Sequence, residues 1–188
     1  MRIVAGSAKG RTLAAPKSDD VIRPTADRVR ETLFNVLGQT CDGLAVLDLY
    51  AGTGALGLEA VSRGAVKAVL VDRDPESLAL CRQNTATLKF EKQIEIVKND
   101  ALKSIEQLAR RGDRFELVFA DPPYKQNVGL QILRTLDASN VVHDQGVAVI
   151  ETGRDEELPE REGRFERIDE REFGVTTVRI FRFTSAPA

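Results

Sequence analysis

The stretch that decides the fold is VLDLYAGTGALGLEA, residues 46–60. It opens with an apolar run that carries a single acid, Asp48, a pattern typical of a strand buried on both faces of a parallel sheet. Gly52, Gly54 and Gly57 follow in the spacing GxGxxG, at the point where an apolar helix is expected to begin. A strand, a glycine turn and a helix in this order predict a ligand site at the carboxyl end of the strand.

The same alternation continues through most of the chain. We expect parallel strands at residues 44–50, 68–72, 94–98, 115–120 and 146–151, with helices between them. Two further runs, 164–172 and 175–183, should close the sheet as an antiparallel hairpin. The sequence therefore predicts an α/β fold with a doubly wound, mostly parallel, seven-stranded Rossmann-like sheet.

The N-terminal part has a different pattern. Short β-like runs around Gly6 and Gly10 predict a small β-hairpin, and helical apolar spacing begins at Thr25. We expect two domains, an N-terminal extension over residues 1–41 and a catalytic domain over residues 42–188.

Two features separate the glycine loop from a dinucleotide site. Asp48 lies four residues before Gly52, within the strand, where its carboxylate can meet the amino group of a methionine moiety. A dehydrogenase would also need a substrate domain, for which 188 residues leave no room. Asp72 ends the second strand, 20 residues after Gly52, where an acid can accept hydrogen bonds from both ribose hydroxyls. The expected cofactor is S-adenosylmethionine, with S-adenosylhomocysteine as its product.

Other acids near strand ends have two interpretations each. Asp100, after the third strand, can accept the adenine amino group through its side chain, or it can cap the following helix. Asp74 lies past the second strand and is better explained as the N-cap of a helix that begins near Pro75.

The most informative motif is Asp121-Pro122-Pro123-Tyr124, which follows the fourth strand. An exocyclic amine on a base is a poor nucleophile because its lone pair is delocalised into the ring. The Asp121 carboxylate and the Pro122 carbonyl can accept its two N–H groups, and two prolines fix the direction of that carbonyl in advance. Tyr124 offers a ring on which a flipped base can stack. The alternative is a simple strand-end turn, which this position in the sheet disfavours.

Charge is distributed unevenly along the chain. The formal net charge is −2, yet residues 1–41 hold seven Lys/Arg against four Asp/Glu, and the remainder holds 20 against 25. A basic arm on an acidic body can supply phosphate contacts, although a short basic terminus can also be merely solvated.

With these motifs in place, the chain resembles the RsmD family of bacterial ribosomal RNA methyltransferases. The resemblance rests on RIVAGSAKGRTL at the start, RPTADRVRETLFN at 23–35, VLDLYAGTGALGLEA at 46–60 and the DPPY loop. It implies a class I methyltransferase fold and methyl transfer from S-adenosylmethionine to N2 of one guanine in 16S rRNA. The implied substrate is an assembled or nearly assembled small subunit, and the implied location is the cytoplasm.

The resemblance also implies roles for individual residues. The catalytic residues would be Asp121, Pro122, Pro123 and Tyr124. The cofactor would be bound by Asp48, Tyr50, Ala51, Gly52, Thr53, Gly54, Asp72, Asp100 and Ala101. The candidates for RNA contact are Arg2, Lys9, Arg11, Arg23, Arg28 and Arg30. The arginines of RPTADRVRE can instead order the helix by pairing with Asp27 and Glu31.

Several other functions remain as alternatives or are disfavoured. An adenine-N6 methyltransferase would use the same DPPY chemistry, but it normally carries a target-recognition region. A non-catalytic RNA-binding assembly factor would not need all four of Asp48, Asp72, Asp121 and Tyr124. A nicotinamide-dependent oxidoreductase is more distant still. No metal site is expected from two cysteines and one histidine without ligand spacing, nor is a membrane span, and the chain is expected to be a monomer.

Overall fold

The computed structural model describes residues 1–16, 24–123 and 128–185. They form two compact units, Met1–Lys98 and Asn99–Ala188. Two residues predicted to be functional, Arg23 and Tyr124, lie outside the described residues. The units divide between residues 98 and 99, and the boundary predicted after residue 41 stays a prediction.

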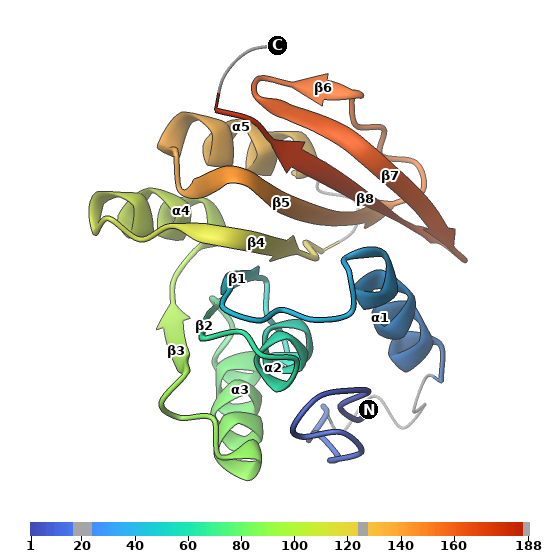
Figure 1. Cartoon of the computed structure of the whole chain (residues 1–188), viewed down its shortest axis with the longest axis vertical. Coiled ribbons are helices and arrows are strands. Elements are labelled where there is room, and N and C mark those ends of the chain that lie inside the picture. Colours follow the sequence, from blue (N-terminus) through green and yellow to red (C-terminus); the bar gives the residue numbers. More distant parts are fainter. Residues whose placement is uncertain (17–23, 124–127, 186–188) are drawn as a thin grey trace. The chain divides into compact units, whose positions relative to one another are not determined.

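The first unit is built on parallel strands in the order β3-β2-β1 (Figure 1). Its elements are α1 (Pro24–Val36), β1 (Ala45–Leu49), α2 (Ala55–Ser62), β2 (Lys67–Asp72), α3 (Pro75–Leu88) and β3 (Ile94–Lys98). Helix α2 packs on β1 and β2, and α3 packs on β2 and β3. Since β1 and β2 run parallel with Asp48 beside Leu70, both strands end at the same edge. Asp48 near the end of β1 and Asp72 at the end of β2 therefore lie at the edge where the glycine loop begins.

The second unit has strands in the order β4-β5-β8-β7-β6. Its elements are α4 (Ala101–Arg110), β4 (Phe115–Ala120), α5 (Gly129–Ser139), β5 (Val142–Gly153), β6 (Arg161–Glu162), β7 (Phe165–Phe173) and β8 (Thr176–Phe183). Strands β4 and β5 are parallel, and β8, β7 and β6 each pair antiparallel with the preceding neighbour. The predicted C-terminal hairpin is confirmed as β7 and β8.

The predicted α/β class is confirmed, while the predicted number of strands is wrong. The described residues contain eight strands, and the additional one is β6, which has only two residues. So short a strand has no alternation to read from the sequence. Strand β5 begins at Val142, earlier than predicted, because the polar run that follows Val142 obscures its start.

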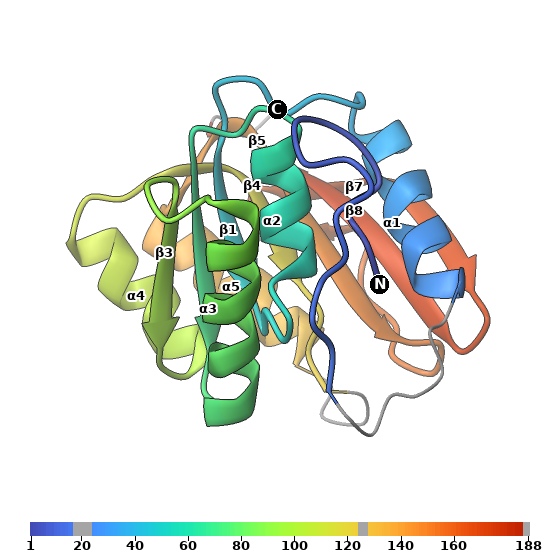
Figure 2. The same ribbon diagram turned by 90° about the horizontal axis from the view of Figure 1, so that it is seen from below.

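The N-terminal segment, defined here as residues 1–16, is the least regular part of the first unit. It folds back on itself as the hairpin prediction expects, but its antiparallel pairing is reduced to one isolated bridge, Arg2 with Thr12, and a few backbone hydrogen bonds such as Ile3 N–H to the Arg11 carbonyl at 2.9 Å. Other backbone N–H groups of the segment bond to side chains of helix α2, beside which the segment runs (Figure 2). Gly6 has a φ of +79°, and a Cβ there would lie 1.7 Å from the Ser62 carbonyl oxygen. Only glycine permits so close an approach of segment and helix.

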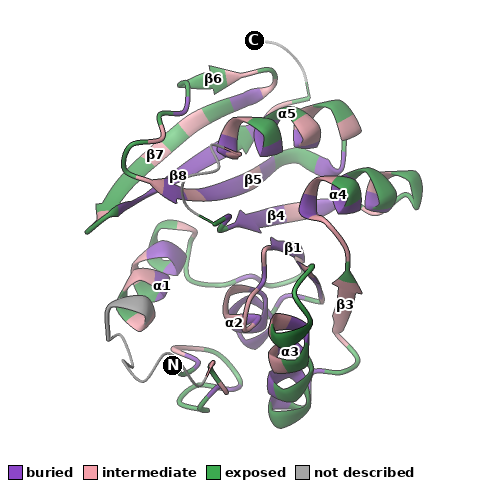
Figure 3. Ribbon diagram, turned by 180° about the vertical axis from the view of Figure 1, so that it is seen from behind, coloured by how far each residue is buried: buried purple, intermediate pink, exposed green. Residues whose placement is uncertain are grey.

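Strands β1 and β2 of the first unit and β4 and β8 of the second are mostly buried, whereas β7 carries many exposed residues (Figure 3). Side chains with no exposed surface include Leu47 on β1, Leu70 on β2 and Phe119 on β4. Burial of these apolar side chains is the main driving force for folding. Polar groups that can act in binding or catalysis are therefore expected in the loops at the strand ends. Among the described residues, no helix has the length and apolar character needed to cross a bilayer.

Candidate functional site

The glycine loop follows β1 directly and turns the chain into α2. Tyr50, Gly52 and Gly54 have φ values of 60°, 55° and 78°, and the Gly54 N–H donates to the Ala51 carbonyl at 2.7 Å. A tight left-handed turn of this kind explains why glycine recurs here. The predicted cofactor-binding residues Tyr50, Ala51, Gly52, Thr53 and Gly54 therefore form one continuous turn.

The glycines of this loop have different roles. A Cβ at Gly57 would lie 2.3 Å from Leu70 Cδ2, so Gly57 is required for packing of α2 against β2. At Gly52 the nearest heavy atom would be the Tyr50 carbonyl oxygen, at 4.0 Å. Gly52 thus leaves open space on the ligand side, which fits a loop that a cofactor approaches closely.

Asp48 lies beneath this loop, with only 2% of its surface exposed. Its Oδ2 accepts a hydrogen bond from the Gly57 backbone N–H at 2.8 Å. Burial raises the pKa of this carboxyl to about 7, the nearby Asp72 charge adds to the shift, and the Gly57 hydrogen bond opposes it. An acid that titrates near neutrality can lose its proton when a cationic amino group binds beside it.

Asp72 is held on the other side of the loop by two backbone amides. Its Oδ2 accepts from Gly52 N–H at 2.9 Å, and its Oδ1 accepts from Asp74 N–H at 2.9 Å. Each carboxylate oxygen retains a second acceptor site. The side chain is half-buried, so it is fixed in direction and still able to accept hydroxyl groups.

Two acids cap helices as the sequence had suggested. Asp74 caps α3 by accepting from Ser77 N–H at 2.8 Å, a hydrogen bond that lowers the pKa of this carboxyl. Asp100 caps α4 through a 3.2 Å hydrogen bond from Lys103 N–H, which bears out the capping alternative. Ala101, the first residue of α4, is buried with 4% exposure.

The described part of the DPPY motif follows β4 without an intervening residue. Asp121 and Pro123 are exposed, while Pro122 between them is buried. Proline fixes φ at position 122 and restricts the backbone of Asp121, which precedes it. The expected stacking residue, Tyr124, lies outside the described part of the chain.

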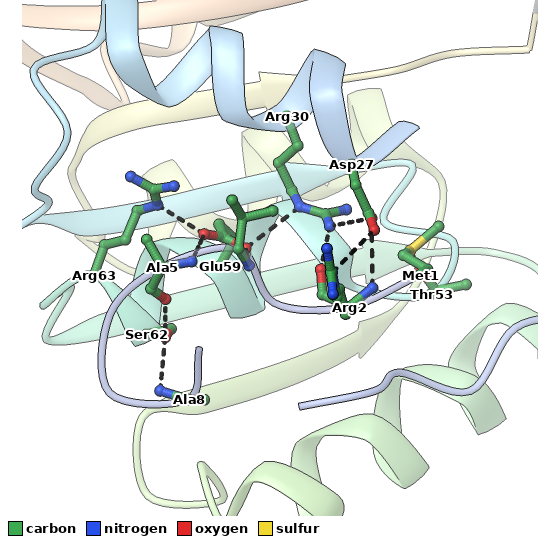
Figure 4. Close-up of polar contacts among 12 residues, drawn as sticks. Met1, Arg2, Ala5, Ala8, Asp27, Arg30, Thr53, Glu59, Ser62 and Arg63 are labelled. Carbon is green, nitrogen blue, oxygen red and sulfur yellow. Dashed lines mark hydrogen bonds and ion pairs between the residues drawn. The ribbon is translucent and has the colours of Figure 1, made fainter. Parts of the chain in front are cut away.

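The basic residues predicted to contact RNA fall into two groups. Arg2, Lys9, Arg11 and Arg28 are exposed. Arg30 is buried, with 4% of its surface exposed; it pairs with Asp27 at 2.7 Å and donates to the Arg2 carbonyl (Figure 4). The structure therefore favours the alternative in which Arg30 orders the helix.

A buried ion-pair cluster, which sequence reasoning did not find, joins these elements. Glu59 on α2 has no exposed surface and accepts from the backbone N–H groups of Val4 and Ala5 at 2.8 and 2.9 Å (Figure 4). Its carboxylate also pairs with Arg30 at 3.4 Å and Arg63 at 2.8 Å. The available signal was a single acid inside the apolar helix sequence ALGLEAVS.

The sequence of this chain is similar to a known protein family over nearly its whole length. Residues 1–182 match the model of a family described as conserved hypothetical protein 95. The chain belongs to this family. The chain is 37% identical over 182 residues to a relative named putative rRNA methyltransferase YlbH, from Bacillus subtilis, with 97% of this chain and 98% of the relative covered.

Two more similarities confirm the RsmD resemblance and the class of fold. The ribosomal RNA small subunit methyltransferase D of Escherichia coli strain K12 is 34% identical, over 97% of this chain and 89% of that protein. A solved structure titled putative methyltransferase yhhF, from Escherichia coli, has a TM-score of 0.86 at 32% identity and covers 99% of both chains. Relatives that are named as methyltransferases therefore match this chain over nearly their whole length.

Among the residues that the structure describes, no group of three or more histidine, cysteine or acidic side chains could hold a metal ion. The two cysteines, Cys41 and Cys81, are both free and buried.

Proposed function

We propose that this protein transfers a methyl group from S-adenosylmethionine to ribosomal RNA of the small subunit. The observation that carries the proposal is the glycine loop held between two carboxylates, with Gly57 N–H on Asp48 and Gly52 N–H on Asp72. A buried acid of near-neutral pKa and an acid fixed at the next strand end suit the methionine and ribose parts of this cofactor. The names of the two relatives, an rRNA methyltransferase and a small-subunit rRNA methyltransferase, support the same reaction class and the same type of RNA.

Each residue of the site would have a separate role in binding or catalysis. When bound, S-adenosylmethionine supplies an electrophilic methyl group. Asp48 would hold the amino group of the methionine part, Asp72 the ribose hydroxyls, and the Gly52 backbone would allow close approach. Asp121 would accept an N–H of the target amine and so direct its lone pair toward the methyl group.

The finer proposal is methylation at the exocyclic N2 of a guanine, guanine 966 of 16S rRNA, within an assembled or nearly assembled subunit in the cytoplasm. The support is the set of family motifs at the N-terminus and the acceptor geometry expected at Asp121. Exposed Arg2, Lys9, Arg11 and Arg28 supply the basic surface for phosphate contacts.

A direct test uses radiolabelled S-adenosylmethionine with three substrates in parallel: small subunits lacking the modification, naked 16S rRNA, and DNA. The labelled product is digested to nucleosides and identified. We expect N2-methylguanosine from the small subunits. Label in N6-methyladenine would assign the adenine alternative, and binding of cofactor and RNA without any transfer would assign an assembly factor.

Cofactor affinity should depend on pH through Asp48. The pKa of its carboxyl is raised to about 7, so the group is mostly neutral at pH 6 and mostly ionised at pH 7.5. A cationic amino group prefers the ionised form. Affinity for S-adenosylhomocysteine should therefore rise roughly five- to tenfold from pH 6 to 7.5, since each pH unit below the pKa costs a factor of ten in ionised carboxylate.

Isothermal titration calorimetry at the two pH values measures this effect. The control is Asp48→Asn, which should bind more weakly and show little pH dependence. Equal pH dependence in both proteins would exclude Asp48 as the group that holds the amino group.

The N-terminal segment should contribute to the salt dependence of RNA binding. Reversing both Lys9 and Arg11 to Glu should weaken binding to 16S rRNA fragments and lower the slope of log K against log salt by about one unit per residue. The matched control reverses Lys92 and Arg110, two exposed basic residues outside this segment. A slope that changes equally in both double variants would remove Lys9 and Arg11 from the interface.

A further inference from the structure

Asn84 on α3 links two segments that lie far apart in the sequence. The side chain has no exposed surface, and its Oδ1 accepts from the Ala14 backbone N–H at 2.7 Å. Its Nδ2 donates to the Ala14 carbonyl at 3.1 Å and to the Thr53 carbonyl at 2.9 Å. One buried amide therefore holds the N-terminal segment and the glycine loop together.

The same helix fixes the neighbouring residue of the loop. The Cys81 thiol donates to the Gly52 carbonyl at 3.2 Å, and burial raises the pKa of this thiol to about 12, so that it keeps its proton. Two successive loop carbonyls, those of Gly52 and Thr53, thus receive hydrogen bonds from side chains one helical turn apart on α3. Movement of the loop away from α3 would lengthen both of these hydrogen bonds.

Further contacts join the N-terminal segment to the same region. The Thr53 hydroxyl lies 3.6 Å from the Met1 sulfur, and Figure 4 shows these two residues side by side. Arg11 donates through Nη2 to the Thr87 carbonyl on α3 at 2.5 Å. These contacts link the N-terminal segment, which carries exposed basic residues, to the loop that the proposed cofactor would contact.

We propose that Asn84 is a positioning residue that couples the glycine loop to the N-terminal segment, so that occupancy of the loop by cofactor orders the segment proposed to contact RNA. This inference rests on the proposed function, because it takes S-adenosylmethionine or S-adenosylhomocysteine as the ligand. It also predicts the sequence of binding events: cofactor binds first, and the cofactor-bound protein then presents a more rigid basic segment to RNA.

The physical reason is that a ligand shifts an equilibrium only through contacts that differ between two states. A ligand against the Gly52 backbone restricts the loop and keeps the Thr53 carbonyl on the Asn84 amide. The buried amide, held at its other end by Ala14, then loses its own freedom to turn. Coupling of this kind is reciprocal, so ordering of the segment should also favour cofactor binding.

Hydrogen exchange followed by mass spectrometry tests the coupling, with S-adenosylhomocysteine as the probe and the full chain as the sample. In the wild-type protein, the ligand should slow exchange in peptides from residues 48–57 and also, by on the order of fivefold, in peptides from residues 2–14. Asn84→Leu, similar in shape but without polar atoms, should keep the first effect and lose the second.

Two other variants complete the test. Thr85→Val is the matched control, because Thr85 neighbours Asn84 on α3 and its buried hydroxyl has no hydrogen-bond partner among the described residues. It should behave as the wild type. Ala14→Pro removes the Ala14 N–H from the linkage, keeps the Ala14 carbonyl and also fixes φ at this position, and it should reduce the coupling even if Asn84→Leu fails to fold.

The outcomes separate the coupling from the proposed function. Ligand-dependent slowing of the segment that survives in both Asn84→Leu and Ala14→Pro would overturn the coupling. So would wild-type protection confined to residues 48–57, and in that case the proposed function would stand. If the wild-type protein bound no S-adenosylhomocysteine at all, the proposed function would fall and the coupling with it.

Discussion

Replacing Asp121 by alanine should lower the rate constant for methyl transfer by about 100- to 1,000-fold, the usual effect of removing one fixed group that stabilises a transition state. The affinity for S-adenosylhomocysteine should stay within about twofold of the wild type. Asp121 is exposed at the end of β4, next to the buried Pro122, and we assign it to the target amine rather than to the cofactor. Loss of rate without loss of cofactor affinity is the signature of that role.

Single-turnover methyl transfer to small subunits measures the rate, and calorimetry measures the affinity. The control is Glu106→Ala, which removes an exposed acid of α4 whose partner Arg110 is also exposed. Such a pair contributes little, so this variant should match the wild type. If Asp121→Ala lost cofactor affinity as well as rate, Asp121 would belong to the cofactor site instead.

Asp121→Asn refines the same prediction. Asparagine keeps an acceptor oxygen but loses the negative charge, which separates hydrogen bonding from charge stabilisation. A rate intermediate between wild type and alanine would show that both contribute. A rate equal to that of the wild type would show that the acceptor alone matters.

The parts of the fold with strong local patterns could be predicted from the sequence. Strands β3 and β4 begin and end where the apolar runs 94–98 and 115–120 do. The cap at Asp74 could be predicted for the same reason, since a capping residue and its helix are neighbours in the chain. The residues that determine these elements are neighbours in the sequence, so the sequence pattern alone is enough to predict them.

The N-terminal segment could not be predicted in the same way. Several of its backbone N–H groups bond to Glu59 and Ser62, more than 50 residues away, and no local pattern in the sequence indicates these contacts. Arg30 shows the same limit, because a sequence counts every arginine as available charge. Only the tertiary structure shows that this one is buried between Asp27 and Glu59.

The candidate site also contains residues that local sequence patterns predict and residues that only the tertiary contacts reveal. The acids Asp48, Asp72 and Asp121 could be proposed from the sequence because each lies in or directly after a strand of a recognisable pattern. Asn84 could not, because its function lies in two partners, Ala14 and Thr53, that are distant in the chain. The spacing of Leu78, Cys81, Asn84, Thr85 and Leu88 along α3 was the available signal, since it places a polar amide on the buried face.

Glu59→Ala should destabilise the protein by about 3–5 kcal/mol, the usual cost of breaking a buried ion pair by removing one partner. Arg30 and Arg63, with 4% and 8% exposure, would lose the carboxylate that compensates their charge. The N–H groups of Val4 and Ala5 would lose their acceptor as well. Against a typical total stability of about 5–15 kcal/mol, a loss of this size is a large share.

Urea unfolding followed by circular dichroism measures the loss, with Glu31→Gln as the control. Glu31 is an exposed acid on α1, so the control should stay within about 0.5 kcal/mol of the wild type. Because the Glu59 pairs are buried, their contribution should change little with added salt, unlike that of surface pairs. A destabilisation below about 1 kcal/mol, or one that disappears in salt, would mean that the cluster is not the anchor of the N-terminal segment. The segment's position would then depend on its apolar contacts, chiefly the fully buried Ile3.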